Sequence, residues 1–217
     1  VKGRFSNESA PVRCIECELG KWQSNPTSKQ CHEVEPGYER RGPALQEQCP
    51  AGRSGQGGSN MCTDCKPGYF QNEMAMISCR ECPQGFKQDK PRRTECIDCV
   101  KGRFSNESAP VRCIECERGK WQNKKGERSC QDCPEGYFQS ERGMVECLEC
   151  RAGLFADSNK SIGCSSCAKG RFSPDPGQYS CSVCPKGWKS TESFTFCKTR
   201  ISAVDCDVTR EYLDISN

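Results

Sequence analysis

Residues 99–116 read CVKGRFSNESAPVRCIEC, and this stretch holds one complete copy of a pattern that runs along most of the chain. It opens on the second cysteine of one Cys-x-x-Cys pair and closes on the next pair, Cys113 and Cys116. Gly102 follows Cys99 by three residues, and the aromatic Phe104 comes two residues later. From Cys62 onward such pairs begin at every seventeenth residue, at 62/65, 79/82, 96/99, 113/116, 130/133, 147/150, 164/167 and 181/184. This internal repeat organises the sequence.

Each repeat predicts a tight turn followed by a short β-hairpin. Glycine readily takes the positive φ that such a turn requires, and in the KPGY stretch at 66–69 the proline favours a type II turn. The aromatic residue is the largest apolar side chain of most repeats, and we expect it to lie across the neighbouring disulfide. No segment has helical periodicity.

The composition predicts a scaffold held by covalent bonds. The chain has 217 residues, 22 of them cysteine, which is typical of disulfide-rich proteins. Hydrophobic residues, cysteine included, make up only 34%, so disulfides must replace a large core. We expect an elongated, solenoid-like rod of short β-hairpins in which each repeat contacts mainly its neighbours. Residues 1–197 then form about twelve repeats of about 17 residues, irregular at 31–62, and 198–217 begin a different module or a linker.

Two consecutive cysteines of the pattern are missing, and their positions suggest how the others pair. Val34 stands where a second cysteine is expected, and Gln46 stands where the next first cysteine is expected. A bond from the second cysteine of one pair to the first of the next makes these positions partners, so one lost bond explains both. Spacing alone does not normally determine connectivity, so the rule is a hypothesis. It joins Cys17 to Cys31, Cys49 to Cys62, Cys65 to Cys79, Cys82 to Cys96, Cys99 to Cys113, Cys116 to Cys130, Cys133 to Cys147, Cys150 to Cys164, Cys167 to Cys181 and Cys184 to Cys197.

Two cysteines remain unpaired within this segment, Cys14 and Cys206. Residues 1–18 are identical to residues 100–117, so the partner of Cys14 would precede Val1. We therefore expect the natural chain to continue upstream with the same repeat. Cys206 lies beyond the last glycine–aromatic repeat, and we expect its partner beyond the segment or in a neighbouring chain.

The sequence also bears on location and partners. Disulfides persist in oxidising compartments, which predicts a secreted or cell-surface protein that follows the secretory pathway. Three Asn-x-Ser triplets, at Asn7, Asn106 and Asn159, are candidate N-glycosylation sites and predict a glycoprotein. The net charge of +3 comes from interleaved basic and acidic residues, which indicates no nucleic-acid partner. No apolar run is long enough for a membrane span.

The unit Cys-x-x-Cys-x-x-Gly-x-aromatic resembles the ephrin-receptor-like, or GCC2/GCC3, cysteine-rich repeats. It is also similar to the first loop of tumour-necrosis-factor-receptor cysteine-rich modules, and so to small scaffolds of the EGF-like or TNFR-like kind. The resemblance covers about residues 1–197 and implies elongated, disulfide-linked rods. The family is a scaffold class found in receptor ectodomains, secreted matrix proteins and surface proteins of microbial eukaryotes.

Other interpretations of the same residues have less support. Tandem Cys-x-x-Cys pairs can form zinc ribbons, but a continuous array marks off no closed four-cysteine site, so we expect no metal. A redox role needs a thioredoxin-like β-α-β pattern, which is lacking. His32 beside Cys31 has no third group to orient it as a catalytic pair. Exposed aromatics could be binding hot spots, but their fixed phase favours packing on the disulfides.

The sequence therefore predicts a protein that is not an enzyme and carries no cofactor. The expected function is structural: an elongated stalk or filament component of the cell surface, the matrix or an appendage such as a flagellar hair. Its partners would be proteins, namely neighbouring copies or other extracellular structural proteins, with glycans at the triplets. The alternative is the ectodomain of a receptor that binds a protein ligand.

Overall fold

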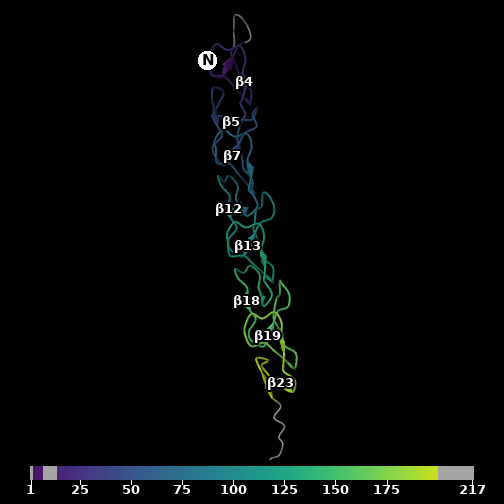
Figure 1. The fold of residues 1–217 in the computed structure, drawn as a ribbon. Coiled ribbons are helices and arrows are strands. Elements are labelled where there is room, and N and C mark those ends of the chain that lie inside the picture. Colours follow the sequence, from purple (N-terminus) through teal and green to yellow (C-terminus); the bar gives the residue numbers. More distant parts are fainter. Residues whose placement is uncertain (1, 7–13, 200–217) are drawn as a thin grey trace, which may run out of the picture. The chain divides into compact units, whose positions relative to one another are not determined.

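The computed structural model describes residues 2–6 and 14–199. These residues contain no helix and form twelve antiparallel hairpins of two short strands each (Figure 1). Every hairpin pairs two strands that are consecutive in the chain, and no strand joins two hairpins into a larger sheet. The expected class, a disulfide-rich fold of short β-hairpins, is confirmed.

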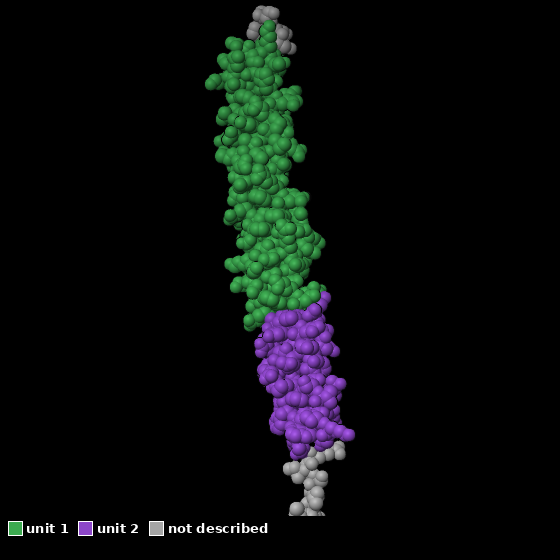
Figure 2. Space-filling view, viewed as in Figure 1, with its two compact units in different colours: residues 1–132, 141–146 green, residues 133–140, 147–217 purple. Residues whose placement is uncertain are grey.

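The chain forms two compact units, which we describe separately (Figure 2). Unit 1 comprises residues 1–132 and 141–146, and unit 2 comprises residues 133–140 and 147–217. The strands of unit 1 are β1 (Arg4–Phe5), β2 (Ile15–Glu16), β3 (Lys21–Trp22), β4 (His32–Glu33), β5 (Tyr38–Arg40), β6 (Gln46–Gln48), β7 (Arg53–Ser54), β8 (Thr63–Asp64), β9 (Tyr69–Phe70), β10 (Arg80–Glu81), β11 (Phe86–Lys87), β12 (Ile97–Asp98), β13 (Arg103–Phe104), β14 (Ile114–Glu115), β15 (Lys120–Trp121) and β16 (Gln131–Asp132). Those of unit 2 are β17 (Tyr137–Phe138), β18 (Leu148–Glu149), β19 (Leu154–Phe155), β20 (Ser165–Ser166), β21 (Arg171–Phe172), β22 (Ser182–Val183), β23 (Trp188–Ser190) and β24 (Cys197–Thr199).

The turn before each hairpin forms as the sequence predicts. In the KPGY stretch, the amide of Tyr69 donates to the carbonyl of Lys66 over 3.0 Å, and Gly68 has a φ of +87°. These are the hydrogen bond and the positive φ of a type II turn with glycine at its third position. The turn delivers the chain directly into β9, which pairs with β10.

Successive hairpins within each compact unit are tied by backbone hydrogen bonds that recur with the seventeen-residue period. In unit 1 the amide of Gly85 donates to the carbonyl of Ser105 over 2.8 Å, and the amide of Gln88 donates to that of Pro110 over 3.0 Å. In unit 2 the amide of Gly136 donates to the carbonyl of Ala156 over 2.9 Å. Each hairpin is therefore joined to the next by main-chain groups. These hydrogen bonds do not depend on which side chains the residues carry.

The hairpin loops reach beyond the adjacent repeat, which differs from the nearest-neighbour contacts expected from the sequence. A Cβ placed on Gly85 would lie 2.0 Å from the carbonyl oxygen of Gly126, two repeats further along the chain. The same approach joins Gly68 to Ala109, and in unit 2 Gly136 to Gly177. Gly68, Gly85 and Gly136 are thus required twice, once for the positive φ and once because a later loop lies against the α-carbon.

The contacting loop residue has a fixed backbone conformation of its own. It takes a positive φ in nine successive repeats, at Gly58, Ala75, Arg92, Ala109, Gly126, Gly143, Lys160, Gly177 and Phe194. Four of these are glycines in a second column of the repeat, and the other five adopt the left-handed conformation at a cost of about 1–2 kcal/mol each. The shared conformation shows that the loop geometry is imposed by packing and not by residue type.

The buried interior consists mainly of the second cysteine of each pair and of the residue three positions after the turn glycine, which is a glutamine in five repeats. Gln71, Gln88, Gln122 and Gln139 are less than 2% exposed and stand three residues after the turn glycine. In Gln122, Nε2 donates to the carbonyl of Ser129 over 2.9 Å, and Oε1 accepts from the amide of Lys124 over 3.0 Å. The side chain thereby connects the two arms of its hairpin loop.

A Gln122→Ala substitution is expected to destabilise this loop by about 1–2 kcal/mol, because two buried backbone groups lose their partner. The measurement is hydrogen exchange at the amide of Lys124, which should become about tenfold faster. Gln131→Ala, on the exposed side of β16, is the matched control and should leave that rate unchanged. Equal rates in both variants would contradict the proposed role of the buried amide.

Candidate functional site

The feature with the clearest chemical role is the series of disulfides. The structure joins Cys17–Cys31, Cys49–Cys62, Cys65–Cys79, Cys82–Cys96, Cys99–Cys113, Cys116–Cys130, Cys133–Cys147, Cys150–Cys164, Cys167–Cys181 and Cys184–Cys197. These are the cysteines that the pairing rule joins. In eight of the ten bonds the partners are 14 residues apart, and in the other two 13. Every bonded sulfur is occupied, so none of them is a thiolate available to zinc.

The pairing rule leaves two cysteines without a partner, and the structure describes only one of them. Cys14 is exposed and is the one cysteine of the described residues without a disulfide. Cys206 lies outside the described residues, as does almost all of the segment 198–217.

The repeat without a disulfide retains the geometry of the missing bond. Val34 is 1% exposed, so it fills the buried position of the absent cysteine. The side chain of Gln46 reaches back to the adjacent residue, and its Oε1 accepts from the amide of Glu35 over 2.9 Å. The two substituted positions therefore lie side by side, held by packing and one hydrogen bond instead of a covalent bond.

A buried carboxylate stabilises the same repeat. Glu39, in β5, is 3% exposed, and its Oε2 accepts from the amide of Cys62 over 3.0 Å. Arg41 Nη2 lies 2.8 Å from its Oε1, and Arg53 Nη1 lies 3.4 Å from its Oε2. Arg53 also donates to Asp64 from Nε over 2.7 Å. A charge network thus links the hairpin β5–β6 to the hairpin β7–β8, where most other repeats carry an aromatic residue in place of Glu39.

The double substitution Val34→Cys and Gln46→Cys is expected to form an eleventh disulfide and to stabilise this repeat by about 2–3 kcal/mol. The check is peptide mapping under non-reducing conditions, together with hydrogen exchange of residues 35–48. Val34→Cys alone is the control, since it supplies a thiol without a partner. Recovery of free thiols at positions 34 and 46 of the double variant would contradict the pairing rule.

Cross-strand pairs beside the turn glycine combine a hydrogen-bond donor with a carboxylate. Arg103 pairs with Glu115, and Tyr69 pairs with Glu81 and donates to its Oε1 over 3.0 Å. In unit 2 Tyr137 donates to Glu149 over 3.1 Å. These hydrogen bonds to the carboxylates raise the pKa of both exposed phenols, Tyr69 and Tyr137, above the ordinary value. Surface pairs of this kind align strands but contribute little stability.

A groove lies between the hairpins β11–β12 and β13–β14 of unit 1, and we call it the junction groove. It has a volume of about 750 Å³. Its lining includes the apolar Ile97 and Val100, the disulfide-bonded Cys113, five basic side chains and three carboxylates. A groove at the same position of the repeat occurs in unit 2, lined by Phe138, Leu148, Glu149, Arg151, Leu154 and Cys164, with a volume of about 460 Å³. The same position of the repeat thus forms a groove in each unit, and the two grooves differ in volume.

A family model described as tyrosine-protein kinase ephrin type A/B receptor-like matches residues 52–99, 102–137 and 119–163, which together make just over half of the chain. The chain belongs to this family. Its ephrin-receptor-like repeats are cysteine-rich, receptor-like extracellular modules and not catalytic domains. A search of the curated proteins gave no match.

The remaining candidate residues of the ephrin-receptor-like repeats lie on the surface. Asn106 and Asn159 are exposed, whereas Asn7 lies outside the described residues. His32 is exposed in β4, opposite Trp22. Most of the repeat aromatics are half-buried, and their packing across the disulfides stays a prediction.

Two further features concern residues 2–6 and 14–199, namely helices that could cross a membrane and groups of side chains that could hold a metal ion. No helix among them is long and apolar enough to cross a membrane. No group of three or more His, Cys, Asp or Glu side chains in the same ranges is arranged to hold a metal ion.

The buried glutamines and the second column of glycines were not identified from the sequence, although the sequence carries a signal for each. The buried glutamines stand three residues after the turn glycine, in YFQ, KWQ and FKQ triplets at one phase of the repeat. The second glycine column, at Gly126, Gly143 and Gly177, also keeps the seventeen-residue period. Aligning the repeats on every column, and not only on the cysteines, would have revealed both.

Proposed function

We propose that this chain is a structural spacer, an elongated stalk or filament component that is secreted and acts at the cell surface, in the matrix or in an appendage. The observation that carries the proposal is the combination of a disulfide in almost every repeat with backbone bonds from each hairpin to the next. The disulfides and the backbone hydrogen bonds both recur at constant spacing. A protein that carries tension requires such uniform reinforcement along its length, whereas a single binding site does not.

The disulfides give the proposal a mechanical consequence. A tensile force on the chain cannot extend the residues between two bonded cysteines, because the bond carries the load across the loop. Each disulfide with a separation of 14 residues therefore withholds about 40–45 Å of chain extension. Such a chain would hold its length under load.

Force spectroscopy on the full chain, held at its two ends, measures this directly. The oxidised chain is expected to release little length, and addition of a reductant should add about 40–45 Å for each bond that is cleaved, because the bonded cysteines already span 5.7 Å. An oxidised chain that extends as far as the reduced one would contradict the mechanical role.

A receptor ectodomain is the second candidate, because the matched family is receptor-like. Deletion of residues 117–150 separates the two, since it removes two complete repeats, keeps the cysteine phase and spares the junction groove. A spacer is expected to give shorter particles in electron micrographs of the native assembly, in proportion to the repeats removed. Retained binding of a soluble ligand, with no effect of repeat number on function, would favour the receptor.

A further inference from the structure

The junction groove is unusual because its basic residues are not required by the fold. The repeat itself supplies the comparison, since the same positions recur every 17 residues. Five basic side chains line the groove: Lys87, Lys90, Arg93, Arg103 and Arg112. The residues at the equivalent positions 51 further along are Phe138, Glu141, Met144, Leu154 and Gly163. A hairpin of the same form thus needs none of these charges.

The junction groove and the smaller groove of unit 2 differ at the position two residues after the turn glycine. Two residues after the turn glycine, an aromatic stands in the other repeats between Gly68 and Gly170: Phe70, Phe104, Trp121, Phe138, Phe155 and Phe172. The junction groove has Lys87 there. In the smaller groove of unit 2 the ring of Phe138 occupies this place. The larger of the two grooves therefore carries a lysine where the smaller one carries a ring.

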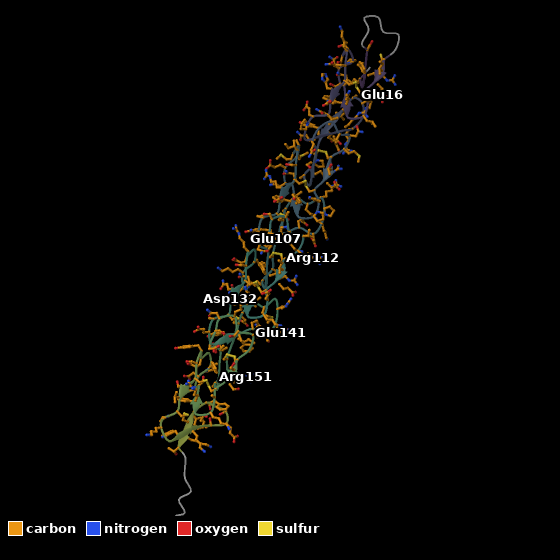
Figure 3. The ribbon with its side chains drawn as sticks, turned by 90° about the vertical axis from the view of Figure 1, so that its right-hand side faces the viewer. Glu16, Glu107, Arg112, Asp132, Glu141 and Arg151 are labelled. Atoms are coloured by element: carbon orange, nitrogen blue, oxygen red, sulfur yellow. A yellow bond between two sulfur atoms is a disulfide. The ribbon has the colours of Figure 1, made fainter. Side chains whose placement is uncertain are left out.

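Three of the basic residues have no partner of opposite charge within the described residues. Lys87 lies 3.6 Å from Asp89, and Arg103 pairs with Glu115. Lys90, Arg93 and Arg112 are exposed and form no salt bridge with any described residue. Figure 3 shows Arg112 among the charged side chains that project from the ribbon. These cations are available to an anionic ligand.

The lining favours a peptide over a polyanionic polysaccharide. Ile97 and Val100 are 48% and 55% exposed, so the groove offers apolar contact area. It contains no aromatic ring on which a sugar could stack. Its carboxylates, Asp89, Glu95 and Asp98, would repel a uniformly charged polymer but accept hydrogen bonds from peptide amides. A chain that alternates acidic and apolar side chains fits this lining.

We infer that the junction groove binds the segment 201–217 of a second copy of this chain. The sequence of that segment, ISAVDCDVTREYLDISN, has four carboxylates, one arginine and several aliphatic residues, so it complements the unpaired cations and the apolar lining. The inference deepens the proposed function, because it rests on copies of the chain associating and names the surfaces that join them. Attraction between the charges gives orientation and on-rate, and burial of the aliphatic side chains gives affinity.

The test uses the full chain and a fluorescent peptide of residues 201–217 with Cys206→Ser. Anisotropy is expected to show saturable binding that weakens with salt. Arg93→Glu with Arg112→Glu should weaken it at least tenfold, or about 1.4 kcal/mol. Lys124→Glu with Lys125→Glu changes the net charge equally on an exposed loop outside the groove and should leave the affinity within twofold.

A second variant separates loss of binding from loss of folding. Lys87→Phe introduces the ring that stands at the equivalent position 138, so it should fold with all its disulfides and still lose binding, because the groove becomes smaller and loses one cation. Sedimentation of the full chain should show association that depends on concentration and disappears in Arg93→Glu with Arg112→Glu.

Several results would overturn the inference. They are absence of peptide binding, equal losses in the groove and control variants, a Lys87→Phe chain that binds normally, or a full chain that stays monomeric. Binding of a sulfated polysaccharide in place of the peptide, sensitive to the same two arginines, would assign the groove to a glycan instead. If the peptide binds but function does not depend on the number of repeats, the spacer function is contradicted and the binding role of the junction groove stands. If function depends on the number of repeats but the peptide does not bind, the binding role is contradicted and the spacer function stands.

Discussion

Gly85→Ala is expected to destabilise the contact between its turn and the loop two repeats later by about 3–5 kcal/mol. Two costs add. The alanine would have to hold a φ of +87°, and its Cβ would lie 2.0 Å from the carbonyl oxygen of Gly126. Because that atom belongs to the backbone, the loop itself must move. Hydrogen exchange at the amide of Gly126, which donates to the carbonyl of Cys99 over 2.9 Å, should become at least a hundredfold faster.

Two other glycines serve as controls for the separate costs. Gly58 has a φ of +62° with no described atom within 4 Å of the place that a Cβ would take, and alanine stands at the equivalent positions 75 and 109. Gly58→Ala should therefore cost only about 1–2 kcal/mol. Gly163 has neither constraint, and Gly163→Ala should have almost no effect. If all three variants behaved alike, close approach of the later loop would play no part in stability.

Glu39→Gln is expected to destabilise the repeat without a disulfide by about 3 kcal/mol, because it leaves the half-buried guanidinium of Arg53 without its buried charge partner. The glutamine keeps the volume of the side chain but not its charge. It has one acceptor oxygen where Glu39 uses two, one towards Arg41 and one towards Arg53 and the Cys62 amide. Exchange of the Cys62 amide, which donates to Glu39, reports the loss directly. We expect this rate to rise about a hundredfold.

The control for this prediction is Glu47→Gln, which removes the exposed carboxylate that pairs with Arg41 over 2.7 Å. Surface pairs contribute about 0–1 kcal/mol, so the effect should be small. Introducing the eleventh disulfide, through Val34→Cys and Gln46→Cys, should restore most of the stability lost in Glu39→Gln. Failure of that rescue would show that the charge network and the missing bond act on different parts of the repeat.

Much of the chemistry could be predicted because it is local in the sequence. A disulfide between residues 14 apart needs only a turn between them, and the glycine at the turn is visible in every repeat. The paired substitution of cysteine by Val34 and Gln46 was informative for the same reason, since both positions belong to one hairpin. Period, pairing, hairpins and the absence of helical pattern therefore followed from residue types at fixed spacing.

Contacts between repeats could not be predicted in the same way. The carbonyl of Gly126 approaches Gly85 across 41 residues, and that distance depends on how far each hairpin is rotated from the one before it. No residue type specifies this rotation, because it results from main-chain hydrogen bonds such as that between Gly85 and Ser105. For this reason, the expectation of contacts mainly with adjacent repeats did not include the approach of a loop from two repeats away.

The same distinction between local and tertiary information applies to the candidate functional features. The cysteines, their pairing and the repeat that lacks a bond are properties of the sequence alone, because covalent partners lie within one hairpin. The burial of Glu39 and the junction groove were decided by tertiary structure, because each brings together side chains from two hairpins. Lys87 shows the difference most plainly: in the sequence it is one substituted aromatic, and only the packing of adjacent hairpins places it in a groove with Arg103 and Cys113.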